Sequence, residues 1–187
     1  TIDWNAAANA AGLVDVGATA LPASPITVPI AAGVAAGTYT GTLYVTNGNG
    51  CASTGNVFTL TINPLPTISS AASAASVCFN AGAQSSTLTY GATTAAPTNY
   101  TIDWDAAANA AGMVDVGSTA LPASPITIAI AAGVAPAVYT GTLFVTNGNG
   151  CASTGSAFTL TINSLPTITP AAAAADVCFN TAAQSST

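Results

Sequence analysis

The chain contains no lysine, arginine or histidine, and its only charged side chains are six aspartates. Charged residues make up 3% of the 187 residues, against roughly a quarter in an ordinary soluble domain. Nucleic-acid binding is excluded, because it depends on Lys and Arg side chains that neutralise phosphates. Most enzyme chemistry is excluded too, because the usual bases and amines are missing. We therefore expect a binding, spacing or scaffolding protein that is not an enzyme and uses no cofactor.

Long apolar runs are also absent, although half of the residues are hydrophobic. Much of that hydrophobic fraction is alanine, which contributes little to a core. No run approaches the roughly 18 to 20 apolar residues that a membrane-spanning helix needs. We expect no transmembrane segment in this sequence.

A tandem repeat with a period of 100 residues organises the chain. The segment Thr1-Ile-Asp-Trp recurs at Thr101, Cys51-Ala-Ser-Thr-Gly recurs at Cys151, and Val77-Cys-Phe-Asn recurs at Val177. Of the 87 positions that can be aligned at this period, 69 are identical. Such close copies indicate a segment of a longer array of repeats.

The repeat boundaries are expected at two proline-containing linkers, Asn63-Pro-Leu-Pro-Thr67 and its counterpart beginning at Asn163. Proline donates no ladder hydrogen bond and favours an extended path. We expect one complete repeat over residues 66–163. It is preceded by the C-terminal part of a repeat over residues 1–63 and followed by the N-terminal part of the next over residues 166–187.

Short segments rich in Thr, Val, Ile and aromatic residues indicate strands. Phe158, Leu160 and Ile162 alternate with threonines, and Asn-Gly pairs precede them in a hairpin loop. About seven antiparallel strands per repeat predict an all-β fold of tandem immunoglobulin-like β-sandwiches. The expected strands lie at 87–90, 100–104, 114–116, 126–130, 139–146 and 157–162. The alanine-rich stretch 105–112 is expected to form either one helical turn or an irregular loop.

Four cysteines give two per period, which is typical of one disulfide per repeat in an oxidising compartment. The repeat boundaries favour a Cys78–Cys151 disulfide, with Cys51 and Cys178 paired to cysteines outside the sequence. A Cys51–Cys78 bond across the linker is the main alternative. Free or metal-bound thiols are a further alternative, although a zinc site usually needs clustered Cys and His.

The aromatic residues of the complete repeat are expected in its core. Trp104 lies between the two cysteines in sequence, as the core Trp of an immunoglobulin-type sandwich does. Tyr139 and Phe158 also lie on predicted strands. We therefore predict that Trp104, Tyr139 and Phe158 pack in the core. The alternative is that Trp104 is an exposed platform for stacking on a sugar.

Three carboxylates in the complete repeat, Asp103, Asp105 and Asp115, are the only candidates for acid–base chemistry or calcium binding there. Position 105 is Asn5 in the other copy, which argues against catalysis. No EF-hand pattern is present. We expect solvated or helix-capping aspartates, with no catalytic or metal site, and keep calcium binding as the alternative.

Several motifs together resemble a known class of repeats. They are Val77-Cys-Phe-Asn, Leu121-Pro-Ala-Ser-Pro-Ile-Thr, residues 132–147 and Gly150-Cys-Ala-Ser. They are similar to the immunoglobulin-like and PKD-like repeats of giant Bacteroidota surface adhesins, in particular the SprB-type gliding-motility adhesins of flavobacteria. The resemblance implies type IX secretion, extracellular display on the cell surface, and a role in adhesion or gliding motility.

These features predict a structural repeat segment of a long surface filament or adhesin stalk. Its expected partners are the neighbouring repeats of the same chain and other filament proteins or glycans. One alternative is a glycan- or surface-binding module in each repeat. The other is a self-assembling sheath or S-layer-like protein.

Overall fold

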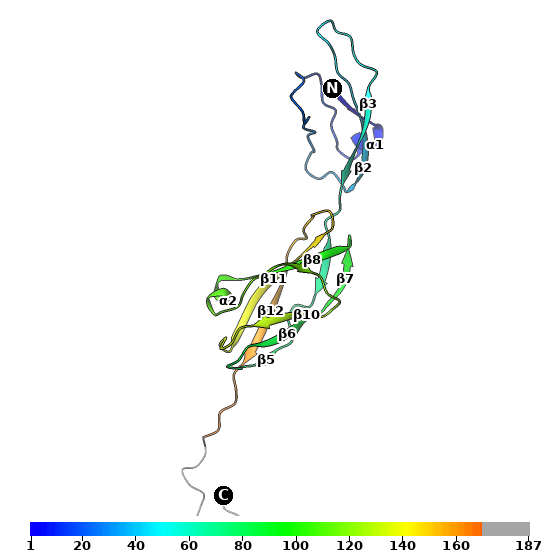
Figure 1. Ribbon diagram of the computed structural model, residues 1–187. Helices are drawn as coiled ribbons and strands as arrows, with labels where there is room; N and C mark the ends of the chain where they lie inside the picture. The colour runs from blue at the N-terminus through cyan, green and yellow to red at the C-terminus, as the bar shows by residue number, and fades with distance from the viewer. Residues whose placement is uncertain (170–187) are drawn as a thin grey trace, which may run out of the picture.

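The computed structural model describes residues 1–169, and these residues form two β-rich bodies that follow one another end to end (Figure 1). The helices and strands between Ile2 and Ile62 belong to the first body and those between Thr67 and Asn163 to the second. No helix within residues 1–169 has the length and apolar character needed to cross a bilayer. Most of the expected segment 166–187, including Cys178, lies outside the described residues.

The second body contains a sheet of five strands. Their spatial order is β5 (Val77–Cys78), β12 (Ser156–Asn163), β11 (Ala137–Asn147), β8 (Pro97–Trp104) and β9 (Val116–Ala120). Neighbouring strands are antiparallel except β5, which runs parallel to β12. The predicted hairpin is therefore the β11–β12 pair at the centre of this sheet.

Four further strands form two pairs that complete the sandwich. β6 (Gln84–Leu88) pairs with β10 (Ile126–Ile130), and β4 (Thr67–Ser70) pairs with β7 (Tyr90–Thr94). The second body thus has nine strands instead of about seven. The number is higher because two stretches are each divided in two. The stretch from Thr67 to Cys78 pairs first with β7 and then with β12, and the stretch from Gln84 to Thr94 pairs first with β10 and then with β4.

The core lies between these layers and confirms the predicted all-β sandwich. Buried side chains of β6 and β10 pack against the inward faces of β8, β11 and β12. Alternate residues of β12 point inward while the threonines between them are partly exposed, as expected for a strand with one buried face. The buried residues of these strands are Leu88, Ile126, Ile128, Ile130, Tyr100, Ile102, Trp104, Tyr139, Leu143, Val145, Phe158, Leu160 and Ile162.

A close ring contact at the centre of the core explains a glycine within a strand. Trp104 and Phe158 pack edge to face with ring centroids 5.3 Å apart. A Cβ atom at Gly141 would lie 2.8 Å from Phe158 Cζ and 3.0 Å from Trp104 Cε3. Only glycine leaves room for both rings at this point of β11.

The alanine-rich stretch forms a short helix, so the helical alternative is correct. α2 (Ala106–Ala110) begins after Asp105, whose Oδ1 accepts a hydrogen bond from Ala108 N at 2.7 Å. The chain leaves the helix at Gly112, which has a φ of +102°. In the first body, α1 (Ala6–Ala10) is capped in the same way by Asn5.

The first body contains a smaller sheet. β2 (Gly37–Leu43) lies between β1 (Ile2–Trp4) and β3 (Asn56–Ile62), and both pairings are antiparallel. The registers of these pairs repeat those of β8, β11 and β12 in the second body. The buried core of the first body is small and consists of Ile2, Trp4, Ala8 and Leu13.

Candidate functional site

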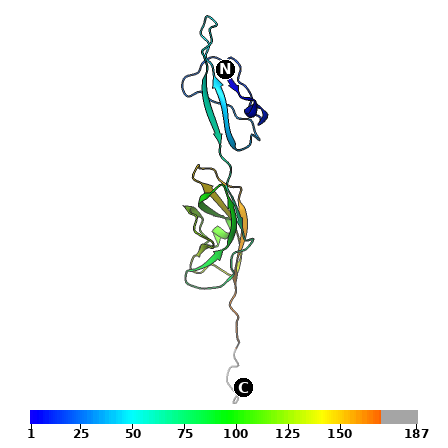
Figure 2. The ribbon, with the colours of Figure 1, turned by 90° about the vertical axis from the view of Figure 1, so that its right-hand side faces the viewer.

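The junction between the two bodies is the best-defined contact outside the cores. The linker after β3 meets the hairpin loop 147–155 of the second body, as Figure 2 shows along the length of the molecule. Asn147 Nδ2 donates to the carbonyl oxygen of Pro64 at 3.2 Å, and Asn149 Nδ2 donates to Asn63 Oδ1 at 3.3 Å. Pro66 is fully buried. The linker is therefore held by hydrogen bonds at Asn63 and Pro64 and by burial of the proline that follows them.

The hairpin loop 147–155 is shaped by its own hydrogen bonds. Asn147 Oδ1 accepts from the backbone nitrogens of Asn149 and Cys151, both at 3.1 Å. Ser153 Oγ accepts from Val145 N at 2.9 Å. The counterpart loop 47–55 has the same three bonds, although within residues 1–169 it makes no hydrogen bond to a linker. The loop is therefore preformed and its shape does not depend on the junction.

Burial of the loop differs between the two copies. Asn147 is buried, whereas its counterpart Asn47 is exposed. Cys151 is half-buried, whereas Cys51 is exposed. In both loops the side-chain oxygen of the Asn makes the bonds within the loop, which leaves its side-chain nitrogen available. At the junction, this nitrogen of Asn147 donates to the linker.

The aromatic residues named by the sequence lie inside the second body. Trp104 is 3% exposed, and Tyr139 and Phe158 are also buried. The Tyr139 hydroxyl donates to the carbonyl oxygen of Ala135 at 2.7 Å. A buried indole has no free face for a sugar ring, so Trp104 does not form a stacking platform.

The three aspartates of the complete repeat serve separate local roles. Asp115 Oδ1 accepts from Trp104 N at 2.8 Å, and Asp105 caps α2. Asp103 lies exposed on β8. Within residues 1–169 no group of three or more metal-ligating side chains occurs.

The predicted Cys78–Cys151 disulfide is wrong, because both cysteines are free and lie at opposite ends of β12. Cys78 is paired with Asn163, the last residue of β12. Cys151 lies in the loop before this strand. A strand of that length spans about 25 Å, far beyond the reach of a disulfide. Cys51 is free as well, so the alternative Cys51–Cys78 bond is not formed either.

The sequence did not indicate that Cys78 and Cys151 lie at opposite ends of β12. The position of Cys78 depends on the parallel pairing of β5 with β12, which involves only two residue pairs and leaves no sequence pattern. The order of the cysteines along the chain says nothing about which end of the sandwich each occupies. A hairpin loop before the last strand was predictable, and it places Cys151 at one end. The position of Cys78 depends on where the divided first strand changes sheets.

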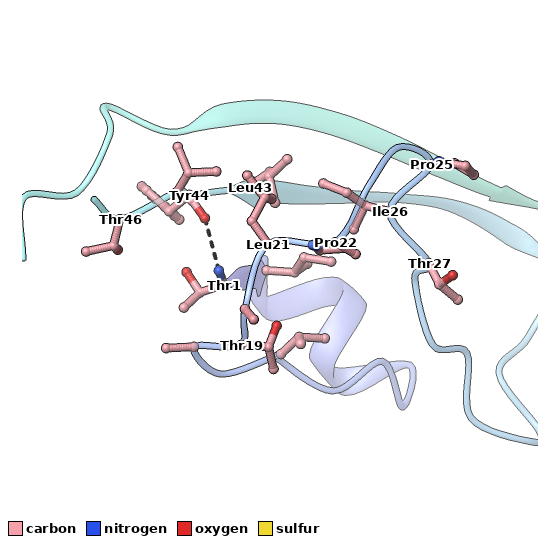
Figure 3. A pocket seen from close by; sticks show the side chains of 15 residues that line it. Thr1, Thr19, Leu21, Pro22, Pro25, Ile26, Thr27, Leu43, Tyr44 and Thr46 are labelled. Carbon is pink, nitrogen blue, oxygen red and sulfur yellow. Dashed lines mark hydrogen bonds between the residues drawn. The ribbon is translucent and has the colours of Figure 1, made fainter. Parts of the chain in front are cut away.

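A pocket of about 340 Å³ opens in the first body (Figure 3). Its lining includes Thr1, Ile2, Leu21, Ile26 and Leu43. In the second body, Ile126 pairs with Leu88, and Thr119 and Ala120 pair with Tyr100 and Asn99. The pocket thus lies where residues 1–63 lack these cross-strand partners, and its lining also includes the polar side chains of Thr19, Thr27, Tyr44 and Thr46.

Comparisons with known proteins gave matches among solved structures. No protein-family model matches the chain, and no similar sequence was found among the curated proteins. Among solved structures, the chain is similar to the fibronectin(III)-like modules of Clostridium thermocellum CbhA, with 15% sequence identity and a TM-score of 0.40. The match covers 71% of this chain and 65% of that one, so the chain spans just under two thirds of the length of that structure.

Proposed function

We propose that this chain is a structural segment of an extracellular stalk, in which β-sandwich repeats follow one another along a surface filament. Its role is to hold the parts of the filament at a distance from one another and to bear load, and we assign it no catalytic role. The sequence resemblance to gliding-motility adhesins supports a role of this filament in cell-surface adhesion and gliding motility after type IX secretion. The partners of each repeat are its neighbours in the chain, and the filament meets other surface proteins or glycans elsewhere.

The contact between loop 147–155 and the linker is the observation that carries this proposal. It joins the end of one repeat to the beginning of the next through hydrogen bonds from Asn147 and Asn149. The contact is head to tail, and such contacts build open, extended assemblies when the rotation between units does not close a ring. A period of 100 residues without insertion repeats this geometry at each junction.

The charge of the chain supports the same role. A repeated unit multiplies its charge along a filament, and net charge far from zero opposes close packing through self-repulsion. With 3% charged residues, each unit adds little repulsion. The absence of Lys and Arg also removes every site for a trypsin-like protease, which suits a thread exposed to the medium.

Solution scattering tests the proposal. We expect light scattering to give a monomer, and small-angle X-ray scattering to give a rod that lengthens by roughly 35 to 45 Å for each added repeat, the length of a sandwich with ordinary strands. A compact particle would contradict a stalk. A regular oligomer at low concentration would favour the sheath or lattice alternative instead.

A matched pair of variants links the scattering to the junction. The variant Asn147→Ala/Asn149→Ala removes both hydrogen bonds to the linker, and we expect the rod to bend more freely, with a shorter mean length. The control, Asn47→Ala/Asn49→Ala, changes the counterpart loop at the free end of the first body and should leave the length unchanged. Equal effects of both variants would show that the junction contact does not align the repeats.

A further inference from the structure

The two cysteines of the complete repeat mark its two ends. Cys151 lies in the loop that meets the preceding linker, and Cys78 lies where the chain leaves the repeat after β12. Both are free thiols, although two cysteines recur in every 100 residues of a chain otherwise poor in reactive side chains. A disulfide within the repeat cannot explain why the two cysteines lie at its opposite ends.

At the exit of the repeat, Cys78 is held beside Asn163. The two residues are partners in the β5–β12 pair, and neighbouring strands lie about 4.8 Å apart. Phe79 N donates to the carbonyl oxygen of Asn163 at 2.8 Å, and Gln84 Nε2 donates to that of Cys78 at 3.0 Å. The Cys78 side chain is exposed at this end. A cysteine therefore stands next to the first residue of the outgoing linker.

At the entrance of the repeat, Cys151 is held beside the incoming linker. Cys151 N donates to Asn147 Oδ1 at 3.1 Å, and the amide nitrogen of the same Asn147 side chain donates to Pro64. Asn149, two residues before Cys151, reaches Asn63. Asn63 is the counterpart of Asn163 at the 100-residue period. Wherever two complete repeats adjoin, Cys78 of one repeat therefore pairs with the linker residue that the Cys151 loop of the next repeat contacts.

We propose that the cysteines form disulfides between successive repeats. Cys151 bonds to the counterpart of Cys78 in the preceding repeat, and Cys78 bonds to the counterpart of Cys151 in the following one. This inference rests on the proposed stalk, because it requires adjoining complete repeats. A disulfide needs Cα atoms about 4.4 to 6.8 Å apart, and the loop contacts to Asn63 and Pro64 hold the end of one repeat that carries Cys151 against the linker next to the other cysteine.

The bond forms by thiol–disulfide exchange with a disulfide oxidant, such as an oxidoreductase or oxidised glutathione. Two cysteine thiols and one donor disulfide give the inter-repeat disulfide and two donor thiols, so the donor takes both electrons and both protons. The bond lies beside the linker and gives each junction a second covalent connection. Force applied along the filament is then shared between the linker and the disulfide.

An extended chain tests the inference directly. A copy of residues 66–100 is placed in phase before Thr1, which completes the first repeat and adds a Cys78 counterpart. Cys178→Ser removes the cysteine that lies outside the described residues. After treatment with oxidised glutathione we expect the number of titratable thiols to fall by two. Mass spectrometry after digestion with a broad-specificity protease should link the added cysteine to Cys151.

Two variants of the extended chain serve as a matched pair. Cys151→Ser should abolish the disulfide and leave all remaining thiols free, whereas Cys51→Ser should leave the bond and its linkage unchanged. A bond from the added cysteine to Cys51, within one repeat, would overturn the inference. So would the absence of any bond in a chain whose tryptophan fluorescence shows that it is folded.

The same samples separate this inference from the stalk. Small-angle X-ray scattering of the oxidised and reduced extended chain reports the shape independently of the thiols. An elongated monomer with free thiols overturns the disulfide and leaves the stalk intact. A compact or associated particle overturns the stalk itself.

Discussion

Residues 1–63 and 101–163 share almost the same sequence but differ in structure. They are identical at 52 of 63 positions. In the second copy, Val116–Ala120 and Ile126–Ile130 are the strands β9 and β10. The counterpart residues 16–20 and 26–30 contain one isolated bridge and no strand. The same local sequence thus forms a strand in one body and an irregular segment in the other.

Burial differs in parallel with the strands. Ile126 and Ile130 are 0% and 2% exposed, whereas Ile26 and Ile30 are 37% and 50% exposed. The second copy has residues 84–100 in front of it, which supply β6 and β8 as partners for β10 and β9. The comparison shows that these strands depend on their cross-strand partners more than on their own propensity.

Supplying the missing partners should remove the difference, and this is the largest effect that we predict. In the chain extended by a copy of residues 66–100 before Thr1, residues 16–20 and 26–30 should become strands. Hydrogen exchange should then slow by orders of magnitude at Ile26 and Val28, whose counterparts Ile126 and Ile128 pair with Leu88 and Ser86, because opening them would require unfolding of the repeat. Unchanged fast exchange in a folded extended chain would show that the sequence differences between the copies, and not the partners, decide the outcome.

A pair of core truncations sharpens the same comparison with a smaller effect. Ile130→Ala removes a buried side chain and should destabilise the second body by about 2 to 5 kcal/mol. Ile30→Ala removes a half-exposed one and should change stability by less than about 0.5 kcal/mol. Urea unfolding followed by the fluorescence of Trp104 in a Trp4→Phe background measures the effect of Ile130→Ala, and unfolding followed by the fluorescence of Trp4 in a Trp104→Phe background measures that of Ile30→Ala. Similar losses from both substitutions would contradict the burial assigned to Ile30.

Much of the fold was predictable from local pattern. The alternation around Phe158 and the Asn-Gly loop before it are strong signals, and β11 and β12 lie where they indicated. Ile126–Ile130 is a strand at the predicted bounds. Each of these segments carries its own turn signal or period, so its structure follows from nearby residues.

Long-range features were not predictable in the same way. The expected strand at 87–90 is divided, since β6 ends at Leu88 and β7 begins at Tyr90. The division reflects pairing of the two parts with β10 and β4, which come from distant parts of the sequence. The failed Cys78–Cys151 assignment has the same origin. Its cysteines follow each other in sequence, but strand pairing decides which end of the sandwich each occupies.

Substitutions at the helix caps have the smallest effect that we predict. The two copies provide a close control, because the capping residue is Asp105 in one and Asn5 in the other, and these side chains differ only by an oxygen in place of an NH2 group. Asp105 Oδ1 accepts from Ala108 N at 2.7 Å, and Asn5 Oδ1 accepts from Ala8 N at 2.9 Å. Asp105→Ala should destabilise the second body by about 1 kcal/mol.

Asp105→Asn should change the stability by no more than a few tenths of a kcal/mol, since Asn and Asp rank together as helix caps. Urea unfolding at neutral pH distinguishes these results. If Asp105→Asn destabilises the protein as much as Asp105→Ala, the charge of Asp105 acts beyond the cap. In that case the capping role assigned to this carboxylate would have to give way to an ionic one, and a titration with calcium would show whether a cation is its partner.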